Sequence, residues 1–254
     1  MNQALPWPVR APEATENVME SIWSAISLTP LESEALRLSL WVSLWAMLAS
    51  LPLAVGAAWL LARRRFPGKT LFDGLLHLPL VVPPVVTGYL LLVVFGRRGL
   101  VGAWLHDQLG ITFAFNWKGA ALAAGVMAFP LMVRAIRLSL EAVDRGLEQA
   151  AHTLGAGAWR VFFTVTLPLT LPGILSGMVL AFARGLGEFG ATITFVSNIP
   201  GQTRTLPLAL YSVLQSPGGE AAAQRLCLIS IVLALAALLV SELLARRVQR
   251  RLKG

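Results

Sequence analysis

The stretch LSLWVSLWAMLASLPLAVGAAWLLA, residues 38–62, contains no charged side chain over its whole length. A run of about 20 apolar residues is long enough to cross the roughly 30 Å hydrocarbon core of a bilayer as an α-helix. Inside lipid, every backbone N–H and C=O needs a partner within the protein, and a helix supplies these partners from the segment itself. The stretch therefore predicts a membrane-spanning helix.

The composition of the whole chain agrees with a membrane protein. Of its 254 residues, 56% are hydrophobic and 13% are charged, whereas about a quarter of the residues of a soluble domain are charged. The net charge of +8 does not indicate nucleic-acid binding, because the basic residues are not clustered with stacking aromatic residues on one solvated face. The single cysteine, Cys227, and three scattered histidines show no metal-ligand spacing, so we expect neither a metal nor a cofactor.

Four further apolar segments complete an expected all-α bundle of about five spans, at residues 71–95, 119–138, 169–196 and 226–245. Pro79, Pro83 and Pro84 interrupt the first of these, and they indicate either a broken helix beside a water-lined path or a static kink. We expect one transmembrane domain over residues 36–254 and an N-terminal extension over residues 1–35, extracytoplasmic or interfacial. Its apolar residues recur at helical spacing, which favours a short interfacial helix or a frayed tail in contact with lipid: Val18, Ile22, Trp23 and Ile26.

The distribution of basic residues predicts the orientation, because lysine and arginine are enriched on the cytoplasmic side of membrane proteins. With five spans, thirteen basic residues fall on one side and seven on the other, while Arg184 lies within the fourth apolar segment. The first side should be cytoplasmic, with the C-terminus there and the N-terminus outside. The thirteen basic residues on this expected cytoplasmic side are Arg63, Arg64, Arg65, Lys69, Arg134, Arg137, Arg145, Arg160, Arg246, Arg247, Arg250, Arg251 and Lys253.

The long cytoplasmic connection at residues 140–168 is more polar than its surroundings. Asp144 can cap a short helix that Gly155 ends. Small and apolar residues fall on one face of this helix, which allows another backbone to approach closely: Leu147, Ala150, Ala151 and Leu154. The pattern indicates a docking element or an amphipathic connector, and we expect residues 159–167 to lie against the membrane domain.

This connection resembles the loop signature of binding-protein-dependent ABC importer permeases, written EAA, three residues, G, nine residues, I, one residue, LP. The matching positions are Gln149, Ala150, Ala151, Gly155, Val165, Leu167 and Pro168. Gln149 stands where the family has glutamate, and Glu148 precedes it, so either residue can be the family's acid. The resemblance implies a coupling helix that docks on a separate ATPase, through Glu148, Gln149, Ala150, Ala151, Gly155, Ala156, Trp159 and Arg160.

Longer stretches resemble the molybdate permeases of this family, above all ARGLGEFGATITFVSNIPGQTRTLPLALYS at residues 183–212. Sulfate and tungstate permeases are relatives, so either ion is an alternative. The resemblance implies a homodimer in the bacterial inner membrane, in contact with lipid, with two ATP-binding ABC subunits and an extracytoplasmic oxyanion-binding protein. The chain itself lacks a phosphate-binding loop that ends in Lys-Ser or Lys-Thr, so we expect no enzyme activity of its own.

Two charges inside the fourth apolar segment are candidates for the translocation path or gate. Arg184 can lend positive charge to an anion path while Gly187–Gly190 forms a bend or gate near its outer end. Alternatively, Arg184 and Glu188 are four residues apart and can form an ordinary ion pair. The candidate path residues are Arg184, Gly187, Glu188, Phe189, Gly190, Thr192 and Thr194. A proton-coupled secondary transporter is a weaker alternative, because Glu188 is the one candidate proton carrier and the sequence shows no repeat.

Overall fold

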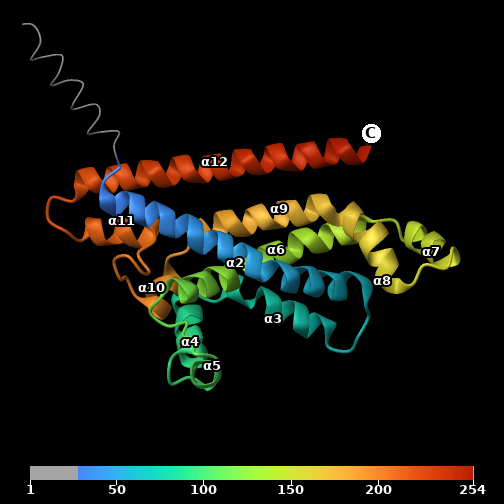
Figure 1. The fold of residues 1–254 in the computed structure, drawn as a ribbon, viewed down its shortest axis with the longest axis horizontal. Helices are drawn as coiled ribbons and strands as arrows, with labels where there is room; N and C mark the ends of the chain where they lie inside the picture. Colours follow the sequence, from blue (N-terminus) through green and yellow to red (C-terminus); the bar gives the residue numbers. More distant parts are fainter. Residues whose placement is uncertain (1–27, 254) are drawn as a thin grey trace, which may run out of the picture.

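The structure is a computed structural model that describes residues 28–253, and within this range it contains helices and turns but no strand. Four long helices lie alongside one another and define the long axis of the molecule (Figure 1). They are α2 (Pro30–Arg63), α6 (Trp117–Ala142), α9 (Leu167–Leu186) and α12 (Glu220–Lys253). The prediction of an all-α membrane bundle is confirmed.

The shorter helices lie at the ends and along one side of this bundle. At one end lie α7 and α8, and toward the other lie α10 and α11, while α3 runs beside the long helices and α4 and α5 project away from them (Figure 1). Their bounds are α3 (Lys69–Val81), α4 (Pro84–Phe95), α5 (Leu100–Leu109), α7 (Arg145–Thr153), α8 (Ala158–Val161), the π-helical turn η1 (Phe162–Thr166), α10 (Gly190–Val196) and α11 (Leu206–Leu214).

Four of the described helices are long and apolar enough to cross a membrane, and α3 with α4 brings the number to five if this bent pair is one span. The first span begins at Pro30, earlier than its charge-free core at residue 38. A capping box holds this start, because Thr29 Oγ1 accepts from Glu32 N while Glu32 Oε2 accepts from Thr29 N. The expected interfacial helix near residues 18–26 lies outside the described residues.

The second apolar segment is broken rather than kinked. Its two halves, α3 and α4, meet at 113°, and a static kink at the prolines is therefore the wrong interpretation. Val82 adopts an extended conformation (φ −73°, ψ 137°), because a residue that precedes proline is disfavoured in the α region. Pro79 lies inside α3 without ending it, so the break comes from the Pro83-Pro84 pair.

The fourth apolar segment is also divided, although we expected one span over residues 169–196. Helix α9 ends at Leu186, and α10 begins at Gly190. Gly187, Glu188 and Phe189 form the connection, and Phe189 lies outside the helical region at φ −129°, ψ −54°. The glycine pair weakens the helix here, so the long apolar run yields a span and a separate short helix.

The centre of the bundle is formed where α2, α6 and α9 pack together. Small residues allow these helices to approach closely, as is usual inside membranes. Ala54 and Ala58 of α2 and Ala123 and Ala124 of α6 are fully buried, and a Cβ added to Gly173 of α9 would overlap Ser139 of α6. Close contacts of this kind fix the positions of the three spans relative to one another.

Candidate functional site

The short helix predicted in the loop at residues 140–168 is present as α7, which protrudes at one end of the bundle (Figure 1). Asp144 caps it as expected, since its Oδ1 accepts a hydrogen bond of 2.8 Å from Gly146 N. Gly155 follows the helix with φ +84°, a left-handed conformation that favours glycine. The sequence therefore located both ends of this helix correctly.

The loop presents apolar side chains to its surroundings. Leu154 and Trp159 are 88% and 78% exposed, and Leu147 is exposed on the same helix as Gln149 and Ala150. The expectation that residues 159–167 lie against the membrane domain holds for one side of this segment, where Val161 and Thr166 are buried. The other side, with Trp159 stacked on Phe163 at 6.3 Å between ring centroids, is exposed.

Glu148 and Gln149 have different environments, although they are adjacent in the sequence. Glu148 Oε1 accepts from Arg63 Nη2 at 2.9 Å and from Thr166 Oγ1 at 2.7 Å, whereas Gln149 is exposed. The acid therefore faces the membrane domain. Sequence reasoning missed Arg63 and Thr166 as partners of Glu148, because they lie 85 and 18 residues away along the chain.

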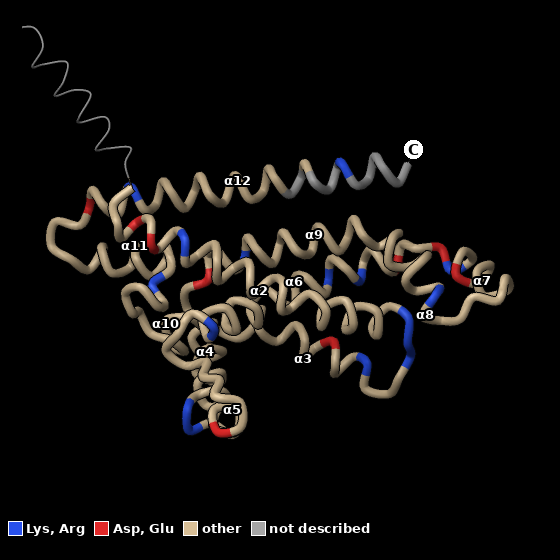
Figure 2. Tube along the Cα trace, viewed as in Figure 1, with Lys and Arg blue, Asp and Glu red and all other residues tan. Residues whose placement is uncertain are grey.

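The remaining loop candidates are either half-buried or exposed. Ala151 and Ala156 are half-buried, while Gly155 and Arg160 are exposed. Figure 2 shows that charged residues gather toward the two ends of the long helices. The basic run Arg63–Arg65 lies at the same end as α7 (Figures 1 and 2), so these two cytoplasmic candidates share one end of the bundle.

Arg184 and Glu188, the charged candidates of the translocation path, form an ion pair of 2.7 Å between Nη1 and Oε2. Glu188 is only 3% exposed, while the Arg184 side chain is 28% exposed. Glu188 also accepts a hydrogen bond of 2.9 Å from Ala191 N through Oε1. The pair therefore neutralises a buried carboxylate and holds the start of α10.

The other path candidates lie around this pair, where they pack against neighbouring residues. Thr194 Oγ1 donates to Gly190 O, and Thr192 is buried. Phe189 packs against Tyr211 at 5.1 Å between ring centroids, and a Cβ on Gly190 would lie 2.7 Å from Pro84 Cβ. The glycine-glutamate element is thus packed against the broken second segment, a contact that sequence reasoning missed.

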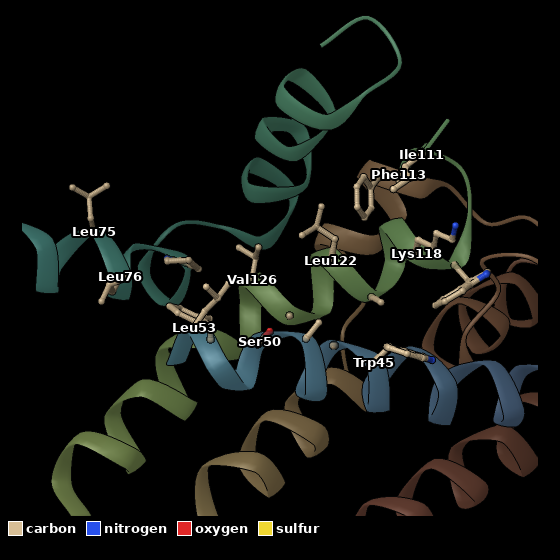
Figure 3. Close-up of a pocket in the computed structure, with 17 residues that line it drawn as sticks. Trp45, Ser50, Leu53, Leu75, Leu76, Ile111, Phe113, Lys118, Leu122 and Val126 are labelled. Carbon is tan, nitrogen blue, oxygen red and sulfur yellow. The ribbon is translucent and has the colours of Figure 1, made fainter. Parts of the chain in front are cut away.

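A separate groove of about 640 Å³ lies between α2, α3, α6 and residues 111–117 (Figure 3). Its walls are mostly apolar, with Trp45, Leu53 and Phe113 among them, and Lys118 lies at one end. Such a lining does not favour a small, doubly charged anion. Among the described residues, no three histidine, cysteine or acidic side chains are grouped to hold a metal ion.

The fold and the loop define a multi-pass helical membrane protein whose protruding loop is separate from its buried charges. Comparison with known families is more specific, since residues 50–254 match the family described as binding-protein-dependent transport system inner membrane component. The chain belongs to this family. It is the permease subunit of an ABC importer in the inner membrane, and the ATPase is a separate subunit.

Two curated relatives are similar over nearly their whole length. The molybdenum transport system permease protein ModB of Escherichia coli K12 is 69% identical over 219 residues, which cover 86% of this chain and 96% of that protein. The protein of the same name in Haemophilus influenzae is 62% identical over 222 residues, with 87% and 97% covered.

A solved structure supports the fold independently of close sequence identity. It is the bacterial alginate ABC transporter in complex with an alginate pentasaccharide-bound periplasmic protein. The similarity has a TM-score of 0.69 at 16% identity and covers 92% of this chain and 94% of that chain. The arrangement of helices described above is therefore the permease fold of ABC importers.

Proposed function

We propose that this permease imports molybdate, and that tungstate or sulfate is the alternative cargo. The observation that carries the proposal is the 69% identity to the molybdenum permease of Escherichia coli over 96% of that protein. The stretch at residues 183–212, which carries the resemblance to molybdate permeases, contains the Arg184–Glu188 pair and the loop after α10.

The proposed assembly contains two copies of this chain, two ATP-binding subunits and an extracytoplasmic oxyanion-binding protein, surrounded by lipid. A second copy or lipid is needed because α4 exposes a nearly continuous apolar surface, including Val85, Tyr89, Leu90 and Val93. The alginate transporter, which shares the fold, was solved with a periplasmic protein, and this supports an equivalent partner here.

In the proposed mechanism, α7 is the coupling helix that binds the ATPase. Its exposed apolar residues Leu147 and Leu154, with Trp159 beyond the turn, supply the contact surface. ATP-driven closure of the ATPases would draw the two coupling helices together and shift the bundle between inward-open and outward-open states. Each ligand can shift this equilibrium only if it binds one of the two states more tightly.

The proposed path passes the element Gly187–Gly190, where the fourth apolar segment is divided. Arg184 is partly exposed, so it can present positive charge to an anion while it remains paired with Glu188. The hydroxyl of Thr194 is already engaged with Gly190 O, and Thr192 is buried. Backbone groups and Arg184 are therefore better candidates than these hydroxyls for stabilising the anion.

The proposed orientation places α7 in the cytoplasm and the N-terminus outside. In a Cys227→Ser background, single cysteines at Arg64, Trp159 and Arg250 should react with an impermeant thiol reagent only from the cytoplasmic side. Cysteines at Arg98, Gln202 and Pro217 should react only from outside. Labelling of the Arg64 and Arg98 positions from the same side would contradict the arrangement.

The proposed cargo is tested by competition. Uptake of labelled molybdate into proteoliposomes that contain the permease, its ATPase and its binding protein should fall when unlabelled molybdate or tungstate is added. Sulfate in the same excess should have little effect. Stronger competition by sulfate than by molybdate would identify a sulfate permease, because the transported ion must be the one that the complete system selects.

A further inference from the structure

The carboxylate of Glu148 joins three parts of the chain that are separate in the sequence. Arg63, the last residue of α2, donates from Nη2 to Glu148 Oε1 at 2.9 Å. Thr166, in the π-helical turn that leads into α9, donates to the same oxygen at 2.7 Å. One atom of α7 is thus bound both to the end of the first span and to the start of the span that carries Arg184.

This contact is sheltered from solvent. The side chains of Arg63 and Glu148 are 9% and 19% exposed, and Thr166 is buried. Hydrogen bonds that involve a charged group are stronger than neutral ones, and screening by salt is weaker for partly buried pairs than for exposed pairs. The Arg63–Glu148 pair therefore restrains α7 more firmly than a surface ion pair would.

The bonding continues from Thr166 into the bundle. Thr170 Oγ1 donates to Thr166 O at 2.6 Å within α9, and Ser139 Oγ of α6 donates to Thr170 O at 3.4 Å. Thr170 is buried. The π-helical geometry is itself informative, because π-helical turns inside longer helices are often found at functional sites. A chain of polar contacts thus runs from α7 to α9 and α6.

We propose that Glu148 is a positioning residue that makes the coupling helix move as one body with the end of α2 and the start of α9. The inference rests on the proposed function, since it assumes that the ATPase binds α7. Glu148 makes its contacts within the permease, whereas the exposed residues of the loop, including Gln149, are available to contact the ATPase. A displacement of α7 is then transmitted to two spans at once.

Single substitutions of each partner test this role. Glu148→Gln and Arg63→Gln remove one charge each, and Thr166→Val removes the second donor. The assembled permease, ATPase and binding protein are reconstituted in proteoliposomes, and molybdate transported per ATP hydrolysed is measured. We expect this ratio to fall between about twofold and thirtyfold in each variant, the range over which residues in coupling networks alter coupling, while the ATPase still co-purifies.

Matched controls lie beside two of these residues. Arg64→Gln removes a neighbouring exposed arginine that lies over Trp59, and Thr164→Val removes an exposed hydroxyl that bonds Arg160 O within its own turn. Both should keep the wild-type ratio. Because Arg63 and Glu148 act through one contact, the double variant should be no worse than Glu148→Gln alone.

Three outcomes would overturn the inference: an unchanged ratio in both Glu148→Gln and Thr166→Val, additive effects of Arg63→Gln and Glu148→Gln, or loss of the ATPase from Glu148→Gln alone. The last result would make Glu148 a direct ATPase contact. If the proposed function itself is wrong, the result is distinguishable from these three, because the unaltered permease would then not co-purify with an ATPase.

Discussion

Replacement of Leu154 by glutamate should release the ATPase from the permease and abolish ATP-driven uptake. Leu154 is 88% exposed at the end of α7, and the proposed function makes it an anchor in the ATPase contact. Loss of an anchor residue weakens a protein interface by about 2 kcal/mol or more, roughly thirtyfold in affinity. A charge placed in the same contact adds an unpaired, desolvated group, so the loss should be larger. The measurement is the amount of ATPase that co-purifies with a tagged permease.

Leu214→Glu is the matched control for this variant. Leu214 ends α11, at the opposite end of the bundle, and is also exposed (Figure 1). It should retain the ATPase fully, because the substitution lies far from α7. If Leu154→Glu retains as much ATPase as Leu214→Glu and transports normally, the loop at residues 140–168 is a connector and not a docking element.

Arg184→Gln should lower molybdate uptake by about tenfold or more, which corresponds to about 1.4 kcal/mol on the transport barrier. The variant removes a positive charge from the proposed path and leaves the buried Glu188 without its ion-pair partner. Arg184→Lys keeps the charge and should lower uptake less. The initial rate of uptake in proteoliposomes is compared with the amount of assembled complex, so that loss of transport is separated from loss of folding.

The double variant Arg184→Gln/Glu188→Gln separates the two roles of the arginine. If Arg184 stabilises the anion directly, the double variant stays defective, because the positive charge is still absent. If Arg184 only neutralises Glu188, the second substitution removes the unpaired charge and uptake recovers. The glutamine at position 188 keeps an oxygen that can accept from Ala191 N, as Glu188 does now. Recovery would contradict a path role for Arg184.

The sequence was most informative where a single local pattern decides the structure. The charge-free run at residues 38–62 predicts its span because hydrophobic length alone decides membrane crossing. Asp144 and Gly155 likewise predict the ends of α7, because capping depends on neighbouring residues in the chain. The resemblance of the loop and of residues 183–212 to importer permeases is confirmed at the level of the family.

The sequence was less informative where two patterns compete. Hydropathy runs without interruption through Pro83-Pro84 and through Gly187–Gly190, so apolar length alone counts each segment as one span, although the prolines and glycines indicated a break or bend within it. The backbone departs from a continuous helix at both positions, with a 113° bend at the first and a helix end at Leu186 at the second. Hydropathy measures only how favourable burial in lipid is, and it does not report whether the backbone can remain helical.

Contacts over long sequence separations could not be predicted. The bond between Arg63 and Glu148 and the one between Glu148 and Thr166 depend on how α2, α7 and α9 pack. Sequence reasoning named Glu148 and Gln149 as alternatives for the family's acid, and only the fold distinguishes the inward Glu148 from the exposed Gln149. The ion pair of Arg184 with Glu188 was foreseen as one alternative, because its four-residue spacing is local.

The central claim is that this permease moves molybdate only when a separate ATPase drives it. The most direct test is the initial rate of molybdate uptake into proteoliposomes that hold the permease and its ATPase, with molybdate-loaded binding protein on the extracytoplasmic face and ATP on the ATPase face. We expect uptake to disappear when ATP, the ATPase or the binding protein is omitted. Uptake that persists without ATP and follows an imposed proton gradient would contradict it and would identify a secondary transporter.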